Sequence, residues 1–258
     1  MIIKAKIRAI GQAFVHGLRQ ILANKLYGLY VYGAVAFPED VLTGDIDFHV
    51  ILTNQLTNDQ RSRIEKLHHS LARDFPPLGG DMDGYYILLA DARRTSPPQS
   101  QMWSRATDAS WALHREHIRA GRCIIFHGPD PKEIYLPSAW LEIEQALKSE
   151  FQYVVDHLDQ YPDWCILQLC RLIYSHRSQD AVVSKAQASD WAYDVLSEWR
   201  KHIEQARKSY FYRQVTPEES RFLLAEARNF LEFACVQIEQ ARQKPSQPDE
   251  TSGAGKGH

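Results

Sequence analysis

The chain has 258 residues, of which 44% are hydrophobic and 24% charged, and this composition is that of an ordinary globular protein with one large domain or two small ones. The formal net charge of -2 argues against an extended nucleic-acid-binding surface. No apolar run approaches the roughly 18 residues of a membrane span, and the start of the chain lacks a signal-peptide core, so we expect a cytoplasmic protein without a membrane segment.

Apolar spacing in the first half predicts a mixture of helices and strands. In chain order the predicted elements are a helix over 4–24, strands over about 27–33 and 45–52, a helix over 58–74, a strand over 83–89, a helix over 107–120 and a short strand and turn over 122–131. Asn58 or Asp59 is the expected N-cap of the second helix.

From about residue 137 the apolar period is helical throughout. Four helices are predicted: one carries a stripe from Leu141 to Leu158, one begins at Pro162, and two cover about 184–209 and 217–242. We therefore predict an α+β fold, with a mixed sheet and flanking helices in residues 1–135 and a helical bundle in residues 136–243. Residues 244–258, rich in Pro, Ser and Gly, are expected to be disordered.

The cysteines and histidines give no metal-site pattern. The four cysteines show neither CxxC pairing nor zinc spacing and are expected to be reduced core residues: Cys123, Cys165, Cys170 and Cys235. His114 and His117 lie three residues apart on a predicted helix. Because no third ligand follows at a recognisable spacing, a solvated helical face is favoured over zinc.

Two acids stand at the centre of the first half. Side chains of a strand alternate between faces, so Asp45 and Asp47 share one face while Ile46 and Phe48 point into the core. Two such carboxylates suit magnesium, which combines a few carboxylates with substrate phosphates and water. Gly33, at the end of the preceding strand, lets the backbone approach a ligand. The alternative for the acid pair is a solvated turn.

A third acid, Asp83, begins the next strand and shares a face with Tyr85 and Ile87. It is able to enter the same sheet surface as the first two carboxylates. The alternative is that Asp81 and Asp83 only solvate a turn.

These residues resemble a known signature. A strand that ends in glycine, a spacer, and Asp45-Ile46-Asp47 between hydrophobic residues is similar to the nucleotidyltransferase signature. Further along, Cys170 to Ser175 and Val183 to Ala192 contain Arg-x-x-Tyr-Ser, Ser-Lys and Asp-Trp-Ala. These elements resemble the helical domain of aminoglycoside nucleotidyltransferases that adenylylate streptomycin and spectinomycin. The resemblance covers roughly residues 25–215.

The resemblance implies transfer of AMP from ATP to a hydroxyl of a small, cationic acceptor such as an aminoglycoside, as in antibiotic resistance. Asp45 and Asp47 would hold magnesium. Asp83 would complete the metal-binding acids or act as general base. Gly33 and Ala34 would lie against the nucleotide.

The resemblance also implies roles for four residues outside the acid group. Lys185 and Arg207 would neutralise the triphosphate, and Trp111 and Asp190 would contact the acceptor in a cleft between the domains. The alternatives are that Lys185 is a surface residue at a helix start and that Trp111 belongs to the core.

Three positions depart from the family pattern. Ala34 replaces Ser or Gly, Asp83 stands where relatives carry Glu, and Ala186 stands where an acid is expected. Magnesium and nucleotide binding are therefore better supported than aminoglycoside binding. Two alternatives stay open: a non-catalytic protein that binds nucleotide or a partner, and a nucleotidyltransferase that acts on RNA or protein. Near-neutral charge argues against RNA.

Overall fold

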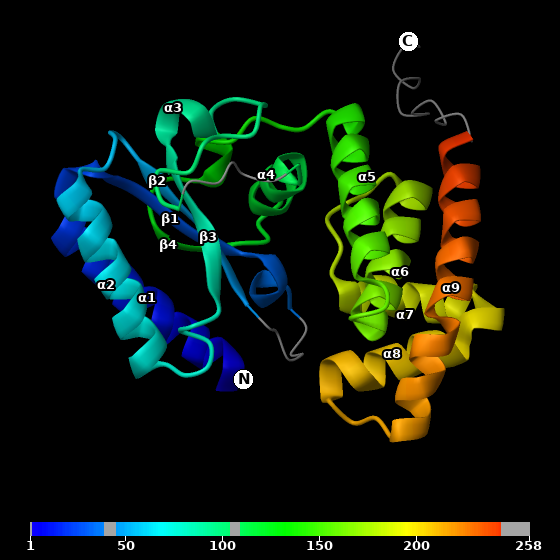
Figure 1. Ribbon diagram of the computed structural model, residues 1–258. Helices are drawn as coiled ribbons and strands as arrows, with labels where there is room; N and C mark the ends of the chain where they lie inside the picture. The colour runs from blue at the N-terminus through cyan, green and yellow to red at the C-terminus, as the bar shows by residue number, and fades with distance from the viewer. Residues whose placement is uncertain (1, 39–44, 104–108, 244–258) are drawn as a thin grey trace, which may run out of the picture.

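The computed structural model describes residues 2–38, 45–103 and 109–243, and the predicted tail over 244–258 lies outside them. The predicted α+β fold class is confirmed, with a mixed sheet and its helices in the first half and helices alone in the second (Figure 1). The boundary predicted between residues 135 and 136 stays a prediction. None of the described helices combines the length and apolar character that crossing a membrane requires.

The described strands form one sheet in the order β3-β2-β1-β4. They are β1 (Leu26–Tyr32), β2 (Ile46–Leu52), β3 (Met82–Leu88) and β4 (Ile124–His127). The first three begin and end within one residue of their predicted bounds, and β4 lies within the strand and turn predicted over 122–131. β1 pairs antiparallel with β2 and β4, whereas β2 and β3 are parallel. The register puts Asp47 opposite Tyr32 on one side and Asp83 on the other, so these three residues form a single row across the sheet.

Alternation along the strands gives the sheet two different faces. On one face Val31, Phe48 and Tyr86 join an apolar core with α1 (Ile2–Leu22) and α2 (Asn58–Asp74). The other face carries Tyr30, Tyr32 and Tyr85, and α4 (Trp111–Arg119) covers it. Figure 1 shows α4 between the strands and the helical half.

Helix α2 has the predicted extent but a different N-cap. Thr57 is the cap: its hydroxyl accepts a hydrogen bond from Gln60 N at 3.2 Å, and Gln60 Oε1 accepts one from Thr57 N at 3.0 Å. This reciprocal capping box satisfies two amide donors at the helix start, which a cap at Asn58 or Asp59 would not do in the same way. The predicted cap is therefore wrong by one or two residues.

The helical half contains five helices in its described part, where four were predicted. They are α5 (Trp140–His157), α6 (Pro162–Ser178), α7 (Lys185–Val195), α8 (Arg200–Tyr212) and α9 (Pro217–Gln243). The single helix predicted over 184–209 is wrong, because Leu196 leaves the helical conformation and Ser197–Trp199 form a short 3-10 turn. Trp199 packs on Phe230 and Phe233 of α9, so tertiary packing overrides the helical pattern at this point.

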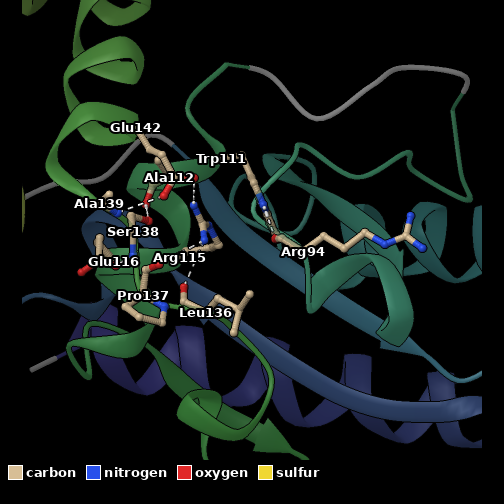
Figure 2. Close-up of polar contacts among 10 residues, drawn as sticks. All are labelled: Arg94, Trp111, Ala112, Arg115, Glu116, Leu136, Pro137, Ser138, Ala139 and Glu142. Atoms are coloured by element: carbon tan, nitrogen blue, oxygen red, sulfur yellow. Dashed lines mark hydrogen bonds and ion pairs between the residues drawn. The ribbon is translucent and has the colours of Figure 1, made fainter.

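Hydrogen bonds and an ion pair hold the segment that connects the two halves against α4 (Figure 2). Arg115, whose side chain is fully buried, donates to Leu136 O at 3.2 Å and to Glu142 Oε1 at 2.8 Å. Ser138 N donates to Glu116 Oε1 at 2.6 Å. These contacts fix where α5 begins relative to the sheet.

The cysteines are free, as expected, but only partly in the core. Cys165 and Cys170 are buried, Cys123 is half-buried, and Cys235 is exposed on α9. The core prediction is therefore wrong for Cys235, which lies on the solvent side of the amphipathic α9.

Candidate active site

A cavity of about 300 Å³ lies between the sheet and the helical half. Both halves contribute to its wall: Tyr32, Gly33, Ala34, Phe37, Asp45 and Asp47 come from the strand ends and the loop between them, Ser110, Leu113, His114 and His117 from α4 and its start, and Glu150, Trp164, Arg171, Ser184, Lys185, Ala186, Tyr210 and Phe211 from the helical half. The cavity therefore brings together the acid pair and two cations that are distant in sequence.

The acidic wall is formed where β2 begins. Asp47 is the second residue of β2, and Asp45 directly precedes the strand. Burial raises the pKa of Asp45, Lys185 lowers it, and the carboxylates of Asp83 and Asp81 raise it further. Negative charge at this wall is therefore incompletely compensated by the protein.

Gly33 has the conformation and the space that only glycine provides. Its φ is +73°, and a Cβ placed on it would lie 1.8 Å from Asp47 Oδ2. The Asp47 carboxylate therefore lies close to the Gly33 backbone, whereas the predicted approach of a ligand to this backbone stays a prediction. Ala34 follows in the cavity wall without the hydroxyl that the family pattern has there.

The cationic wall comes from α6 and the start of α7. Lys185 is the first residue of α7, and the Ser184 hydroxyl caps this helix by accepting from Gln187 N at 3.0 Å. Burial lowers the pKa of Lys185, nearby Arg171 lowers it further, and Asp45 opposes both effects. Lys185 therefore lies inside the cavity, and the alternative of a surface lysine is excluded.

Arg171 is the second cation. Burial lowers its pKa, and Glu150 and Asp47 act against this shift. Its Nε is buried without a hydrogen-bond partner in the described part of the chain. The sequence contained Arg171 within a recognised motif but gave it no role, although an arginine inside the apolar run over 169–173 of α6 is a usable signal.

Glu150 on α5 adds a fixed carboxylate that the sequence analysis missed. Its Oε1 accepts from Ser110 Oγ at 2.5 Å and its Oε2 from Gln168 Nε2 at 2.8 Å. On sequence alone Glu150 looks like an ordinary polar position of an amphipathic helix. Only the packing of α5 against α4 and α6 reveals its place in the cavity.

The two histidines of α4 also line the cavity, and the predicted solvated face is wrong for them. His117 is 7% exposed, its Nε2 is 2.8 Å from Ala181 O, and burial lowers its pKa to about 3. His114 Nδ1 lies 3.1 Å from the Tyr32 hydroxyl. Helix α4 is covered on both sides, because it lies between the sheet and the helical half.

Three of the other predicted residues lie away from the described cavity wall. Trp111 is 1% exposed, and its Nε1 donates to Arg94 O at 3.3 Å, so it is the core residue of the alternative interpretation (Figure 2). Asp190 and Arg207 form an ion pair with each other at 2.5 Å. Neither is in the described cavity wall, because α7 and α8 turn these side chains toward one another.

Asp83 lies beside Asp47 in the strand register but is not among the described residues that line the cavity. No group of three or more histidine, cysteine or acidic side chains in the described ranges is arranged to hold a metal ion by itself. A cation at Asp45 and Asp47 would therefore have to take its remaining ligands from phosphate and water.

Comparison with known proteins places this arrangement in a family context. Residues 140–236 match the family model for the C-terminal domain of aminoglycoside adenylyltransferases. The resemblance to aminoglycoside adenylyltransferases is confirmed. With it, the predicted enzyme class, an adenylyltransferase, is confirmed.

A solved structure extends the likeness to both halves of the adenylyltransferase-like chain. It is the crystal structure of spectinomycin adenyltransferase AAD(9) from Enterococcus faecialis with ATP and spectinomycin. The two chains are 16% identical and superpose with a TM-score of 0.68, over 91% of this chain and 97% of the other. At this identity the match shows a shared fold. No curated protein sequence matches the chain.

Proposed function

We propose that this chain transfers AMP from ATP to a hydroxyl of a small, cationic acceptor in a magnesium-dependent reaction. One observation carries the proposal: Asp45 and Asp47 line the same cavity as Arg171 and Lys185. A nucleotide triphosphate with its cation needs both signs of charge at such close range. The similar fold of a spectinomycin adenyltransferase that binds ATP and spectinomycin supports the proposal.

Asp45 and Asp47 would hold the magnesium ion, with Asp83 as a third carboxylate beside Asp47. The raised pKa of Asp45 supports this, since a cation would compensate the negative charge that the protein leaves. When bound, magnesium neutralises phosphate charge and polarises the attacked phosphoryl group.

Arg171 and Lys185 would bind the phosphates. Both cations line the cavity, and Arg171 Nε is buried without a hydrogen-bond partner in the described part of the chain, so this wall is placed to receive an anion. The α7 amino end and the backbone after Gly33 add amide donors nearby. Arg207 and Asp190 are left out of this assignment because they pair with each other.

The fixed Glu150 carboxylate supports a cationic acceptor. Ser110 and Gln168 hold its two oxygens in place, and it lies in the same cavity as the acid pair. A rigid carboxylate in a partly desolvated cavity favours an ammonium or guanidinium group over a neutral one.

The proposal is tested by pyrophosphate release from ATP and magnesium across streptomycin, spectinomycin and other hydroxylated amines. We expect acceptor-dependent release that disappears in the Asp45→Asn/Asp47→Asn double variant and persists in Asp59→Asn, a substitution of an exposed acid on α2. If no acceptor stimulated pyrophosphate release while ATP still bound in calorimetry, turnover on small hydroxylated amines would be contradicted. A non-catalytic role, or an RNA or protein acceptor, would then be favoured.

The phosphate assignment has its own test. Lys185→Met should weaken ATP binding about tenfold to a hundredfold in calorimetry, since a charge-assisted contact to phosphate is lost. Lys66→Met, which removes an exposed lysine of α2, is the matched control. Equal ATP affinity in both variants would remove Lys185 from the phosphate site.

A further inference from the structure

A second cavity, of about 510 Å³, lies within the helical half. Helices α5 and α9 form its sides and α6 its floor, since α6 packs against both of them (Figure 1). We call it the α5–α9 groove, and the residues that matter for its chemistry include Leu147, Phe151, His176, Cys235 and Ile238. Within the described ranges it shares no lining residue with the candidate active site, so the proposed reaction does not account for it.

Most of the groove is apolar. Leu147 is buried in the core of the helical half, and Phe151 and Ile238 are partly buried against the same core. The lining residues of α5 run from Leu141 to Phe151, a distance of about 15 Å at the rise of an α-helix. Both this length and the volume are those of a pocket for a small organic molecule.

The charges around the groove cancel. Arg242 lies between two lining acids, with Nε 2.7 Å from Glu144 Oε1 and Nη1 3.5 Å from Glu239 Oε2. Lys148 is the other charged lining residue in the described part of the chain, so two bases balance two acids. A ligand with a charged head would lose its hydration here without meeting a net opposite charge, so this balance favours an uncharged ligand.

The groove contains one buried polar side chain whose hydrogen-bonding capacity is unused. His176 is 7% exposed, and neither ring nitrogen has a hydrogen-bond partner among the residues that the structure describes. Its ring contacts Trp140 edge-on, with centroids 6.3 Å apart. Burial lowers the pKa of His176, Glu144 raises it and Arg242 lowers it. A neutral imidazole offers one donor and one acceptor, and a hydroxyl group is able to pair with either.

The chain itself offers a poor occupant for the apolar part of the groove. Residues 244–258 directly follow α9, but their sequence contains no aromatic residue and no Leu, Ile, Val or Met. A segment of that composition gains little from contact with Leu147, Phe151 and Ile238. The combination of apolar walls and an unpaired imidazole therefore indicates a separate small molecule.

We propose that the α5–α9 groove binds a small uncharged amphiphile. The apolar body of this ligand lies against Leu147, Phe151 and Ile238, and its hydroxyl group forms a hydrogen bond with His176. The inference does not depend on the proposed function, because no residue of the acid wall or the cationic wall takes part in it.

Octanol is the probe, and Cys235 reports where it binds. Cys235 is exposed and lines the groove, so bound octanol should shield its thiol from iodoacetamide. At about ten times the Kd measured by calorimetry, alkylation of Cys235 should slow about tenfold. The half-buried Cys123 lies outside the groove and is the internal control, with an unchanged rate. Peptide mass spectrometry separates the two rates.

Two neighbouring substitutions on α9 test the location independently. Cys235→Trp fills the groove from an exposed position and should weaken octanol binding in calorimetry at least about tenfold. Val236→Trp is the matched control, because Val236 is 53% exposed and is not a described lining residue, and it should bind octanol within about twofold of the wild type.

The chemistry of the ligand has its own arms. Octanoate and octylamine have the same chain length with a charged head, and each should bind at least about tenfold more weakly than octanol. His176→Leu removes the hydrogen bond and should weaken octanol binding about tenfold, whereas His176→Gln, which keeps a donor and an acceptor, should lose less.

Four results would overturn the inference. The first is octanol that neither binds nor protects Cys235, and the second is equal affinity in Cys235→Trp and Val236→Trp. The third is undiminished affinity in His176→Leu, or a charged analogue that binds as tightly as octanol. The fourth is a wild-type dimer in sedimentation velocity that Cys235→Trp dissociates and Val236→Trp does not, since the groove would then be an interface between two copies of the chain.

Discussion

The two faces of the sheet come from the same strands and have opposite chemistry. One face, with Val31, Phe48 and Tyr86, is closed by α1 and α2 into an apolar core. The other carries Tyr32 and Asp47 and is covered by α4, with the helical half beyond it (Figure 1). Because polar groups cannot be closed off without partners, the second face ends in an open cavity.

The polar character of the second face also explains why the charged groups of the cavity come from both the sheet and the helical half. Burial penalises the charged form of each, raising the pKa of Asp45 and lowering that of Lys185, while the attraction between the two opposes both shifts. The negative charge of the sheet and the positive charge of the helical half thus partly compensate each other. A bound magnesium-nucleotide would compensate the remaining charge on both sides. Substitutions at two neighbouring residues of β2, one on each face of the sheet, should therefore affect activity and stability differently.

Asp47→Asn breaks the functional face. We expect acceptor-dependent turnover to fall about 10³-fold, because a metal ligand and a preorganised charge are lost together. Stability should change far less than turnover, because the loss of repulsion from Asp83 beside it in the register is opposed by the loss of attraction to the buried Arg171. Kinetics and urea unfolding measure the two effects. Full turnover in Asp47→Asn would remove Asp47 from the metal site.

Phe48→Ala, one residue along β2, breaks the apolar face instead. Phe48 is fully buried, and its ring packs 5.1 Å from that of Phe14 and 5.8 Å from that of Tyr86. Urea unfolding should show a loss of about 3 to 4 kcal/mol from lost transfer energy and cavity formation. Turnover per folded molecule should fall far less than in Asp47→Asn. A large activity loss at unchanged stability would show that the two faces are not separate.

A pH titration sharpens the contrast, because the apolar face contains a histidine. His68 packs against Phe14 and Phe48, its Nε2 is 2.9 Å from the Tyr86 hydroxyl, and burial lowers its pKa to about 4. Its neutral form is favoured in the folded state, so its contribution is complete above the unfolded pKa of about 6.5 and is lost as pH falls toward 4.

His68→Gln keeps a hydrogen-bonding nitrogen but does not titrate. Between pH 6.5 and 4 its stability should fall by about 2 kcal/mol less than that of the wild type, as measured by urea unfolding at each pH. The control is His16→Gln, at an exposed histidine of α1. Parallel curves for His68→Gln and the wild type would contradict the buried neutral state.

Local patterns predicted the sheet and the acid wall well. Alternation alone gave β1, β2 and β3 and put Asp45 and Asp47 on one face, and the register then added Asp83 to the row. Gly33 was also predicted from its place at the end of β1, where its positive φ is a local requirement, and the pairing of β1 with β2 then brings Asp47 against it. These features depend on interactions that the nearby sequence encodes directly.

Features that depend on how distant helices pack were not predictable. Glu150 and Arg171 enter the site only because α5 and α6 lie against α4 and the sheet. Asp190 and Arg207 were assigned to ligands, whereas the meeting of α7 and α8 pairs them with each other. The position of the Trp111 ring was not predictable for the same reason. The rotation of α4 about its own axis decides whether that ring faces the core or a ligand.

The smallest predicted effect lies on the apolar side, at the start of α2, where sequence reasoning chose the wrong cap. Thr57→Ala removes the hydroxyl that accepts from Gln60 N and should cost about 1 kcal/mol in urea unfolding. Asn58→Ala, one residue later, lacks that role and should cost much less. If Asn58→Ala cost more stability than Thr57→Ala, Asn58 would be the cap instead. Turnover should remain unchanged in both variants, because α2 packs on the face of the sheet opposite the acid row.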